Sequence, residues 1–343
     1  MIQHGEPVEG GPKVPSSPVV VPEGPGLLEA YGWVMGYQIA QLIVLTSFTT
    51  LLVWLALPQF PPTVDELVTL FDDLGWEQSF LFMGVTSLAT LGLIVPAVCW
   101  RLKGDVRKSL GMQRVRGSQL LFIVAAVVPL AILSDELYRV ARDGVVWLAQ
   151  VFPVLNPLVQ LDTVQLVQRQ AANTSFPILI VALALGPAIG EELVFRGLIG
   201  QGLIRRRGLI SGVLLTTLLF GFAHGNPAHA IATLPIGLML HYVYVLTGNL
   251  WCSILLHFLI NGVAVALMKL VVADPLPGSP ALLVAAAVFL GVLCLLLWQS
   301  ERKGSRLSWL EWRQGTPFRA VASCGIVAYT VCILWAASTA WGR

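Results

Sequence analysis

Long apolar stretches separated by short polar segments dominate the pattern along this chain. We count nine of them, each close to the length that a helix needs to cross a bilayer. Their approximate limits are residues 30–57, 80–100, 118–137, 176–200, 208–224, 229–247, 250–273, 280–299 and 319–341. Between the third and fourth, residues 138–170 mix apolar and polar side chains, which favours an interfacial helix followed by a loop. The pattern predicts an all-α, polytopic membrane helix bundle with about 8–9 transmembrane helices.

Composition supports the same class of protein. The chain is 56% hydrophobic and only 12% charged, whereas a soluble globular chain is about 25% charged. No basic patch with interleaved aromatic residues stands out, so we expect no nucleic-acid partner. All five cysteines lie in apolar stretches without a CxxC pair, and we read them as small buried hydrophobes.

Charge is distributed unevenly between the loops. Residues 101–117 hold six basic residues and one acidic one, 205–207 are all arginine, and 301–319 hold five basic and two acidic residues. Residues 58–79 hold five acidic residues and no basic one. Nine spans place the three basic loops on one face of the membrane. The positive-inside bias then predicts a multi-pass integral membrane protein, of the plasma or inner membrane in a bacterial host, with a cytoplasmic N-terminus.

An acid pair lies inside the fourth apolar stretch. Ionisable side chains at bilayer depth are costly, so they persist mainly where they have a partner and a task. Glu192 and Arg196 are four residues apart, share a helix face and can neutralise each other. Glu191 points about 100° away and gains no such local partner, which favours a role as general base. The alternative for these residues is a structural ion network that ties helices together.

Two later stretches carry further polar residues at helical spacing. Phe220 and His224 share one face, and His257 and Asn261 share another. A single histidine near a helix end is more often structural, and a His–Asn pair can simply hydrogen-bond between helices. Together with the acid pair, however, they indicate a catalytic site built from three membrane helices.

Other polar residues fit structural roles. We expect Asp135 and Glu136 to form interfacial ion pairs with Arg139 and Arg142, and His241 to serve packing. One geometric difficulty also follows from the spans. At about 1.5 Å per residue, His257 lies about 10 Å from the start of its span, whereas His224 lies about 24 Å from Gly208. Tilt or a re-entrant segment must bring the two histidines together.

The motif Glu191-Glu192-x-x-x-Arg196, followed by Phe220-x-x-x-His224 and His257-x-x-x-Asn261, resembles the three ordered motifs of the CPBP family. This family contains the CAAX proteases and the Abi-type bacteriocin-processing membrane enzymes, and the resemblance covers roughly residues 176–270. It implies an intramembrane endopeptidase, whose substrate is a membrane-associated peptide or a prenylated protein.

The resemblance also implies roles for individual residues. Those matching Glu191 and His224 activate a water molecule, and those matching His257 and Asn261 stabilise the oxyanion, with Glu192, Arg196 and Phe220 in support. Glu191, His224 and His257 are also acceptable Zn²⁺ ligands, although no HExxH motif is present. A metalloprotease and a metal-free glutamate mechanism both stay open.

Two other classes of function stay open as alternatives. One is a non-enzymatic membrane scaffold or immunity protein on the same fold, and the other is a proton-coupled transporter in which buried Glu and His relay protons. For the organisation of the chain we expect four parts. These are a disordered tail (1–26), N-terminal transmembrane helices with the interfacial segment (27–175), a CPBP-type catalytic core (176–272) and C-terminal transmembrane helices (273–343).

Overall fold

A computed structural model describes most of the chain. It covers residues 24–57, 63–103, 105–160, 167–168, 170–171, 173–270 and 280–301. Within these ranges the secondary structure is helical and contains no strand. Seven helical segments are long and apolar enough to cross a membrane, and an eighth apolar helix, α10 (Leu209–Phe222), is shorter. The predicted polytopic helical bundle is therefore confirmed, while the ninth expected span, 319–341, lies outside the described residues.

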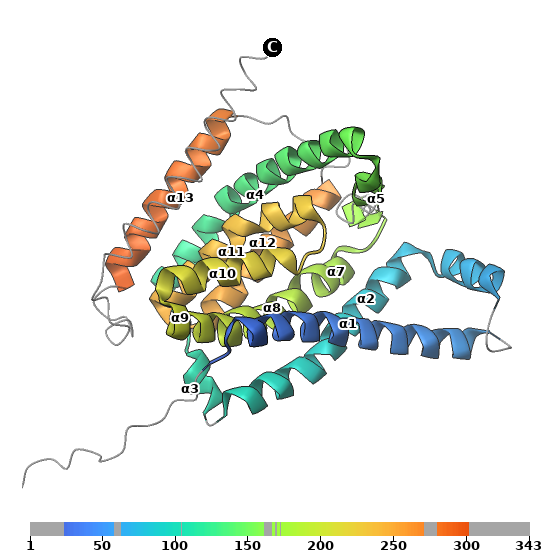
Figure 1. Ribbon diagram of the computed structural model, residues 1–343, viewed down its shortest axis with the longest axis horizontal. Coiled ribbons are helices and arrows are strands. Elements are labelled where there is room, and N and C mark those ends of the chain that lie inside the picture. Colours follow the sequence, from blue (N-terminus) through green and yellow to red (C-terminus); the bar gives the residue numbers. More distant parts are fainter. Residues whose placement is uncertain are drawn as a thin grey trace, which may run out of the picture.

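The two N-terminal helices pack against each other. They are α1 (Leu27–Ala56) and α2 (Val64–Leu102), and Figure 1 shows them diverging from the other helices toward the right of the view. A capping box between Thr63 and Glu66 starts α2. At the other end of α2, Arg101 pairs with Glu29 across 2.6 Å and so joins the end of α2 to the start of α1. The short helix α3 (Val106–Leu110) follows.

Helix α4 (Gly117–Val151) is longer than its apolar stretch suggests. The prediction of a span ending near residue 137, followed by a separate interfacial helix, is wrong because no proline interrupts the helix between Pro129 and Pro153. The expected ion pairs on its second half are confirmed for Arg139, which contacts Asp135 at 3.2 Å and also Glu136. Two short turns follow, η1 (Pro153–Leu155) and α5 (Asn156–Gln160).

The fourth span consists of five helical sections that follow one another without a break. They are α7 (Phe176–Leu179), η2 (Ile180–Leu185), α8 (Gly186–Val194), η3 (Phe195–Gly200) and α9 (Gln201–Arg207). Both η2 and η3 are π-helical and flank α8, which carries the acid pair. Single π-helical turns inside α-helices are frequent at functional sites, because they displace carbonyl groups and side chains from the regular pattern.

The remaining helices complete the bundle. At Gly208, whose φ is 81°, the chain turns from α9 into α10. Asn226 then caps α11 (Pro227–Thr247) by accepting from two backbone N–H groups, and Gly248, with a φ of 59°, leads into α12 (Leu250–Leu270). Figure 1 shows α10, α11 and α12 beside α4 in the centre, with α13 (Pro280–Glu301) beyond α4.

The described parts of the basic loops meet at one end of the bundle. Arg116, before α4, forms an ion pair with Glu301 at the end of α13. Gln201 of α9 donates to the Ser109 carbonyl at 3.2 Å, and Arg206 donates to the Gly24 carbonyl at 2.9 Å. This placement agrees with the expected grouping of basic segments on one face. The cytoplasmic position of that face stays a prediction.

Candidate active site

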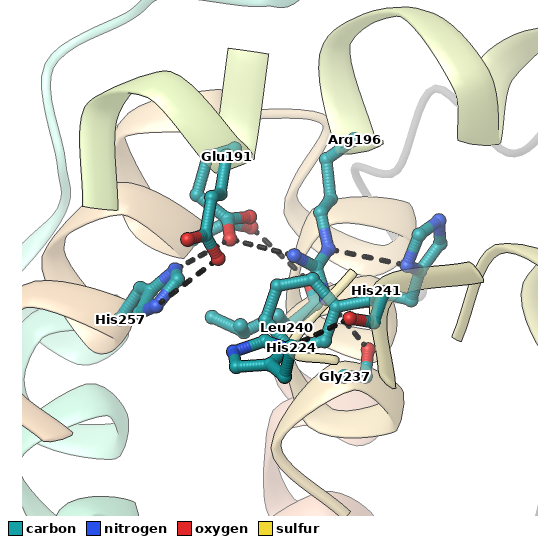
Figure 2. Close-up of polar contacts among 10 residues, drawn as sticks. Glu191, Arg196, His224, Gly237, Leu240, His241 and His257 are labelled. Carbon is teal, nitrogen blue, oxygen red and sulfur yellow. Dashed lines mark hydrogen bonds and ion pairs between the residues drawn. The ribbon is translucent and has the colours of Figure 1, made fainter. Parts of the chain in front are cut away.

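The three sequence motifs converge around the ring of Phe220. Its centroid lies 5.0 Å from that of His224 and 5.9 Å from that of His257. On η3, Arg196 stacks its guanidinium carbon 4.5 Å from the same centroid. Figure 2 shows Glu191, Arg196, His224 and His257 gathered in one region. The structure thus brings together side chains that the span lengths alone seemed to hold apart.

Glu192 and Arg196 form the fully buried centre of the site, and both are 0% exposed. The predicted pair is confirmed, with Arg196 Nη1 donating to Glu192 Oε1 across 2.7 Å. Arg196 also donates from Nη2 to the Gly237 carbonyl at 3.0 Å and from Nε to His241 Nδ1 at 3.2 Å. A buried arginine is tolerated because its N–H groups are paired in this way.

His241 is a member of this network, and sequence reasoning missed it by assigning it to packing. Because Nδ1 accepts from Arg196, the neutral ring carries its proton on Nε2, which is buried without a hydrogen-bond partner in the described structure. One signal could have found it. Gly237 and His241 stand four residues apart on α11, so both face the same neighbour, Arg196.

His257 links the two acids. Its Nδ1 lies 2.8 Å from Glu192 Oε1, and an ionised carboxylate only accepts, so Nδ1 donates. The opposite nitrogen, Nε2, lies 4.0 Å from Glu191 Oε2. That separation is too long for a direct hydrogen bond and is one that a water molecule can bridge. The Glu192 bond therefore fixes which ring nitrogen of His257 faces Glu191.

Glu191 differs from Glu192 in its surroundings. It is 17% exposed, against 0% for Glu192, whereas the buried Oε2 of each acid has no hydrogen-bond partner among the residues that the structure places. This agrees with the expectation that only Glu192 has a local cation. A buried carboxylate oxygen without a partner is costly in a purely structural position, and of the two acids Glu191 is the one that combines such an oxygen with partial exposure, which favours a chemical role.

His224 sits in the turn after α10. Its Nδ1 lies 2.8 Å from the Phe220 carbonyl, which can only accept, so Nδ1 carries a proton and donates it. In the neutral ring Nε2 then keeps a lone pair and can take up a proton. The His229 ring lies 4.6 Å away, centroid to centroid, and shields one side of His224.

Asn261 connects α12 to the π-helical turn η2. Its Nδ2 donates to the Leu183 carbonyl across 3.1 Å. The amide has two N–H donors, and this bond uses one of them. Asn261 lies one helical turn beyond His257. Its bond to the Leu183 carbonyl anchors α12 beside the segment that leads into the acid pair.

The side chains as placed do not fit a metal ion. Over the part of the chain that the structure describes, no group of three or more His, Cys, Asp or Glu side chains is arranged to hold one. His257 already donates from Nδ1 to Glu192, and Nε2 is 4.0 Å from the nearest Glu191 oxygen. Because the described residues form no such group of ligands, the reaction proposed below uses no zinc.

Comparisons with known proteins show what part of the chain is similar to. Residues 173–263 match the family model described as "Type II CAAX prenyl endopeptidase Rce1-like". This matched segment contains all three motifs of the site. Together with the helical bundle, it confirms the predicted resemblance to the CPBP/CAAX family.

One curated relative matches in addition. The Bacillus subtilis (strain 168) protein named "Putative membrane peptidase YdiL" is 24% identical over 101 residues. The match spans 27% of this chain and 41% of the relative. No solved structure matches the chain at a comparable level.

Proposed function

We propose that this protein is an intramembrane endopeptidase that hydrolyses a peptide bond in a membrane-bound or lipid-anchored substrate. The observation that carries the proposal is the buried Glu191 Oε2, which lacks a hydrogen-bond partner in the described structure and faces His257 Nε2. The match to an endopeptidase family supports the same conclusion. A scaffold or immunity protein gives no reason to keep this oxygen unpaired at a hydrogen-bonding cost.

In the proposed reaction Glu191 acts as the general base. It takes a proton from a water molecule, whose oxygen then attacks the carbonyl carbon of the scissile bond. His224 assists through Nε2, the nitrogen left with a lone pair by the Phe220 bond. When the C–N bond breaks, the leaving amine receives the proton that the base took up. Water is consumed, and a carboxylate and an amine are formed.

His257 and Asn261 stabilise the oxyanion in this proposal. A protonated His257 donates from Nδ1 to Glu192 and directs its Nε2–H toward the reacting carbonyl. The cluster is then electrically balanced, because Glu191 and Glu192 face two cations, Arg196 and the imidazolium. A donor aimed at the developing charge in a dry site contributes about 3–4 kcal/mol.

For the substrate we propose a membrane-associated peptide, with prenylated proteins as the leading class because the matched family model is named for prenyl endopeptidases. The orientation follows the charge distribution, with the basic end of the bundle and the N-terminus in the cytoplasm.

The experiment compares peptide products by mass spectrometry in membranes that contain wild type or Glu191→Gln. The amide is nearly the same size as the carboxylate but cannot accept the proton, so we expect product to fall by about 10²-fold or more. Glu29→Gln, which removes another carboxylate at the edge of the bundle, is the matched control and should leave the products unchanged.

Two outcomes would contradict the proposal. Turnover retained in folded Glu191→Gln would reject Glu191 as the base. A peptide pool identical in wild-type membranes and in membranes without the protein, tested with prenylated and unprenylated substrates, would reject proteolysis.

A further inference from the structure

Helix α1 reaches the site although it lies outside residues 173–263, the segment that matches the family model. Most residues of α1 lie on the outside of the bundle, since only 11% of its apolar 18-residue stretch is buried. Two adjacent residues, Tyr37 and Gln38, are exceptions because their polar groups approach α8 and the end of α10.

Tyr37 lies against the helix that carries the acid pair. It is 4% exposed, and its hydroxyl oxygen would be only 2.7 Å from a Cβ atom at Gly190. The glycine thus lets the phenol approach the α8 backbone directly beside Glu191.

Gln38 contacts the other side of the site. Its Nε2 donates to the Ala223 carbonyl across 2.5 Å, between residues 185 positions apart in the chain. Ala223 follows the last residue of α10, where helix carbonyls lack partners within the helix. Ala223 also directly precedes His224, so this bond restrains the backbone from which the His224 side chain extends.

The two contacts are complementary. Adjacent helix residues point about 100° apart, and one turn of α1 therefore reaches both the base and the histidine of the proposed mechanism. Packing alone would need neither polar atom, because a phenylalanine fills the volume of Tyr37 and a methionine nearly fills that of Gln38.

We infer that α1 supplies two positioning residues, with Tyr37 orienting the Glu191 carboxylate and Gln38 setting the position of His224. The inference rests on the proposed function for its kinetic consequences and on contacts alone for its structural ones.

The kinetic test uses the full-length protein in detergent with Tyr37→Phe and Gln38→Met. Tyr37→Phe removes only the hydroxyl, and Gln38→Met removes the bond to the Ala223 carbonyl, while each nearly keeps the side-chain volume. We expect kcat to fall about 10–100-fold with KM little changed, as for a misplaced catalytic group. Tyr31→Phe is the control for Tyr37, since it removes an exposed hydroxyl from the same helix and keeps its ring contact with Phe222. Thr46→Val is the control for Gln38, because Thr46 bonds only to carbonyls of its own helix. Both controls should stay within about twofold of wild type.

A second readout does not depend on activity. In protein labelled with ¹⁵N-histidine, the His224 ring signal is identified by its loss in His224→Gln. Gln38→Met should change the chemical shift of this signal, and Thr46→Val should not. If wild type cleaves nothing, the proposed function fails while this spectrum still tests the Gln38 contact. A Tyr37→Phe kcat that matches that of Tyr31→Phe overturns the role of Tyr37, and a Gln38→Met kcat and His224 ring signal that match those of Thr46→Val overturn the role of Gln38.

Discussion

The helix that carries the acid pair and the outer helices α1 and α13 are all strongly apolar by sequence but differ in burial. In the apolar 18-residue stretch of Phe176–Arg207, 56% of the residues are buried inside the bundle. The corresponding share is 11% for Leu27–Ala56 and 22% for Pro280–Glu301. The buried span holds Glu192 and Arg196 without exposure, whereas the outer helices present mainly aliphatic side chains outward. Ionised groups are thus kept where protein can pair them, and lipid-facing surfaces need only be apolar.

The largest effect should come from breaking the central ion pair. Arg196→Met leaves Glu192 buried without its cation, and we expect a loss of about 3–5 kcal/mol in the free energy of unfolding. The matched change at the bundle edge, Arg101→Met, removes the partner of the more exposed Glu29 and should cost about 0–1 kcal/mol. Thermal unfolding in detergent measures both. Equal losses would show that burial does not distinguish the two pairs.

Glycines offer an intermediate test of the same comparison. A Cβ at Gly200 would lie 2.3 Å from His241 Nε2 and 2.9 Å from the Phe195 carbonyl oxygen, so Gly200→Ala should cost about 1–3 kcal/mol through overpacking. A Cβ at Gly32 on α1 meets nothing within 4 Å. Gly32→Ala should therefore be neutral or stabilise by about 0.5–1 kcal/mol through helix propensity. Unfolding midpoints that reverse this order would contradict the packing described for the core.

The smallest effect should come from the attachment of α13. The Tyr242 hydroxyl donates to the Cys294 carbonyl across 2.5 Å and joins α11 to α13. Tyr242→Phe keeps the ring and removes one hydrogen bond, which contributes about 0.5–1.5 kcal/mol. A cysteine placed on the outer face of α13 by Phe289→Cys should be labelled at nearly the same rate in wild type and in Tyr242→Phe. A loss of stability as large as that of Arg196→Met would mean that α13 belongs to the central core.

The spacing of residues along the sequence predicted contacts within a single helix. The four-residue interval gave the Glu192–Arg196 pair, and apolar length gave most of the spans. Spacing could not predict that His257 would donate to Glu192 rather than to Glu191, because that choice depends on the relative rotation of α8 and α12. The same limit hid His241, whose partner lies on another helix 45 residues away.

The predicted end of the third span was wrong for a different reason. The charged residues after Leu133 suggested an end to the third span, yet a helix continues through charges as long as its backbone bonds are kept, and α4 runs on to Val151. The π-helical turns beside α8 were also beyond reach, since no residue type specifies them. The catalytic roles of Glu191, His224, His257 and Asn261 stay predictions.

A double-mutant comparison of kcat tests most directly whether the acid and histidine motifs form one catalytic unit. Glu191→Gln, His224→Gln and the double variant are assayed for cleavage under single-turnover conditions at equal amounts of folded protein. Residues that act as a unit are strongly non-additive, so the double variant should be no slower than the slower single variant. Losses that multiply, or wild-type turnover in either single variant, would contradict a shared site.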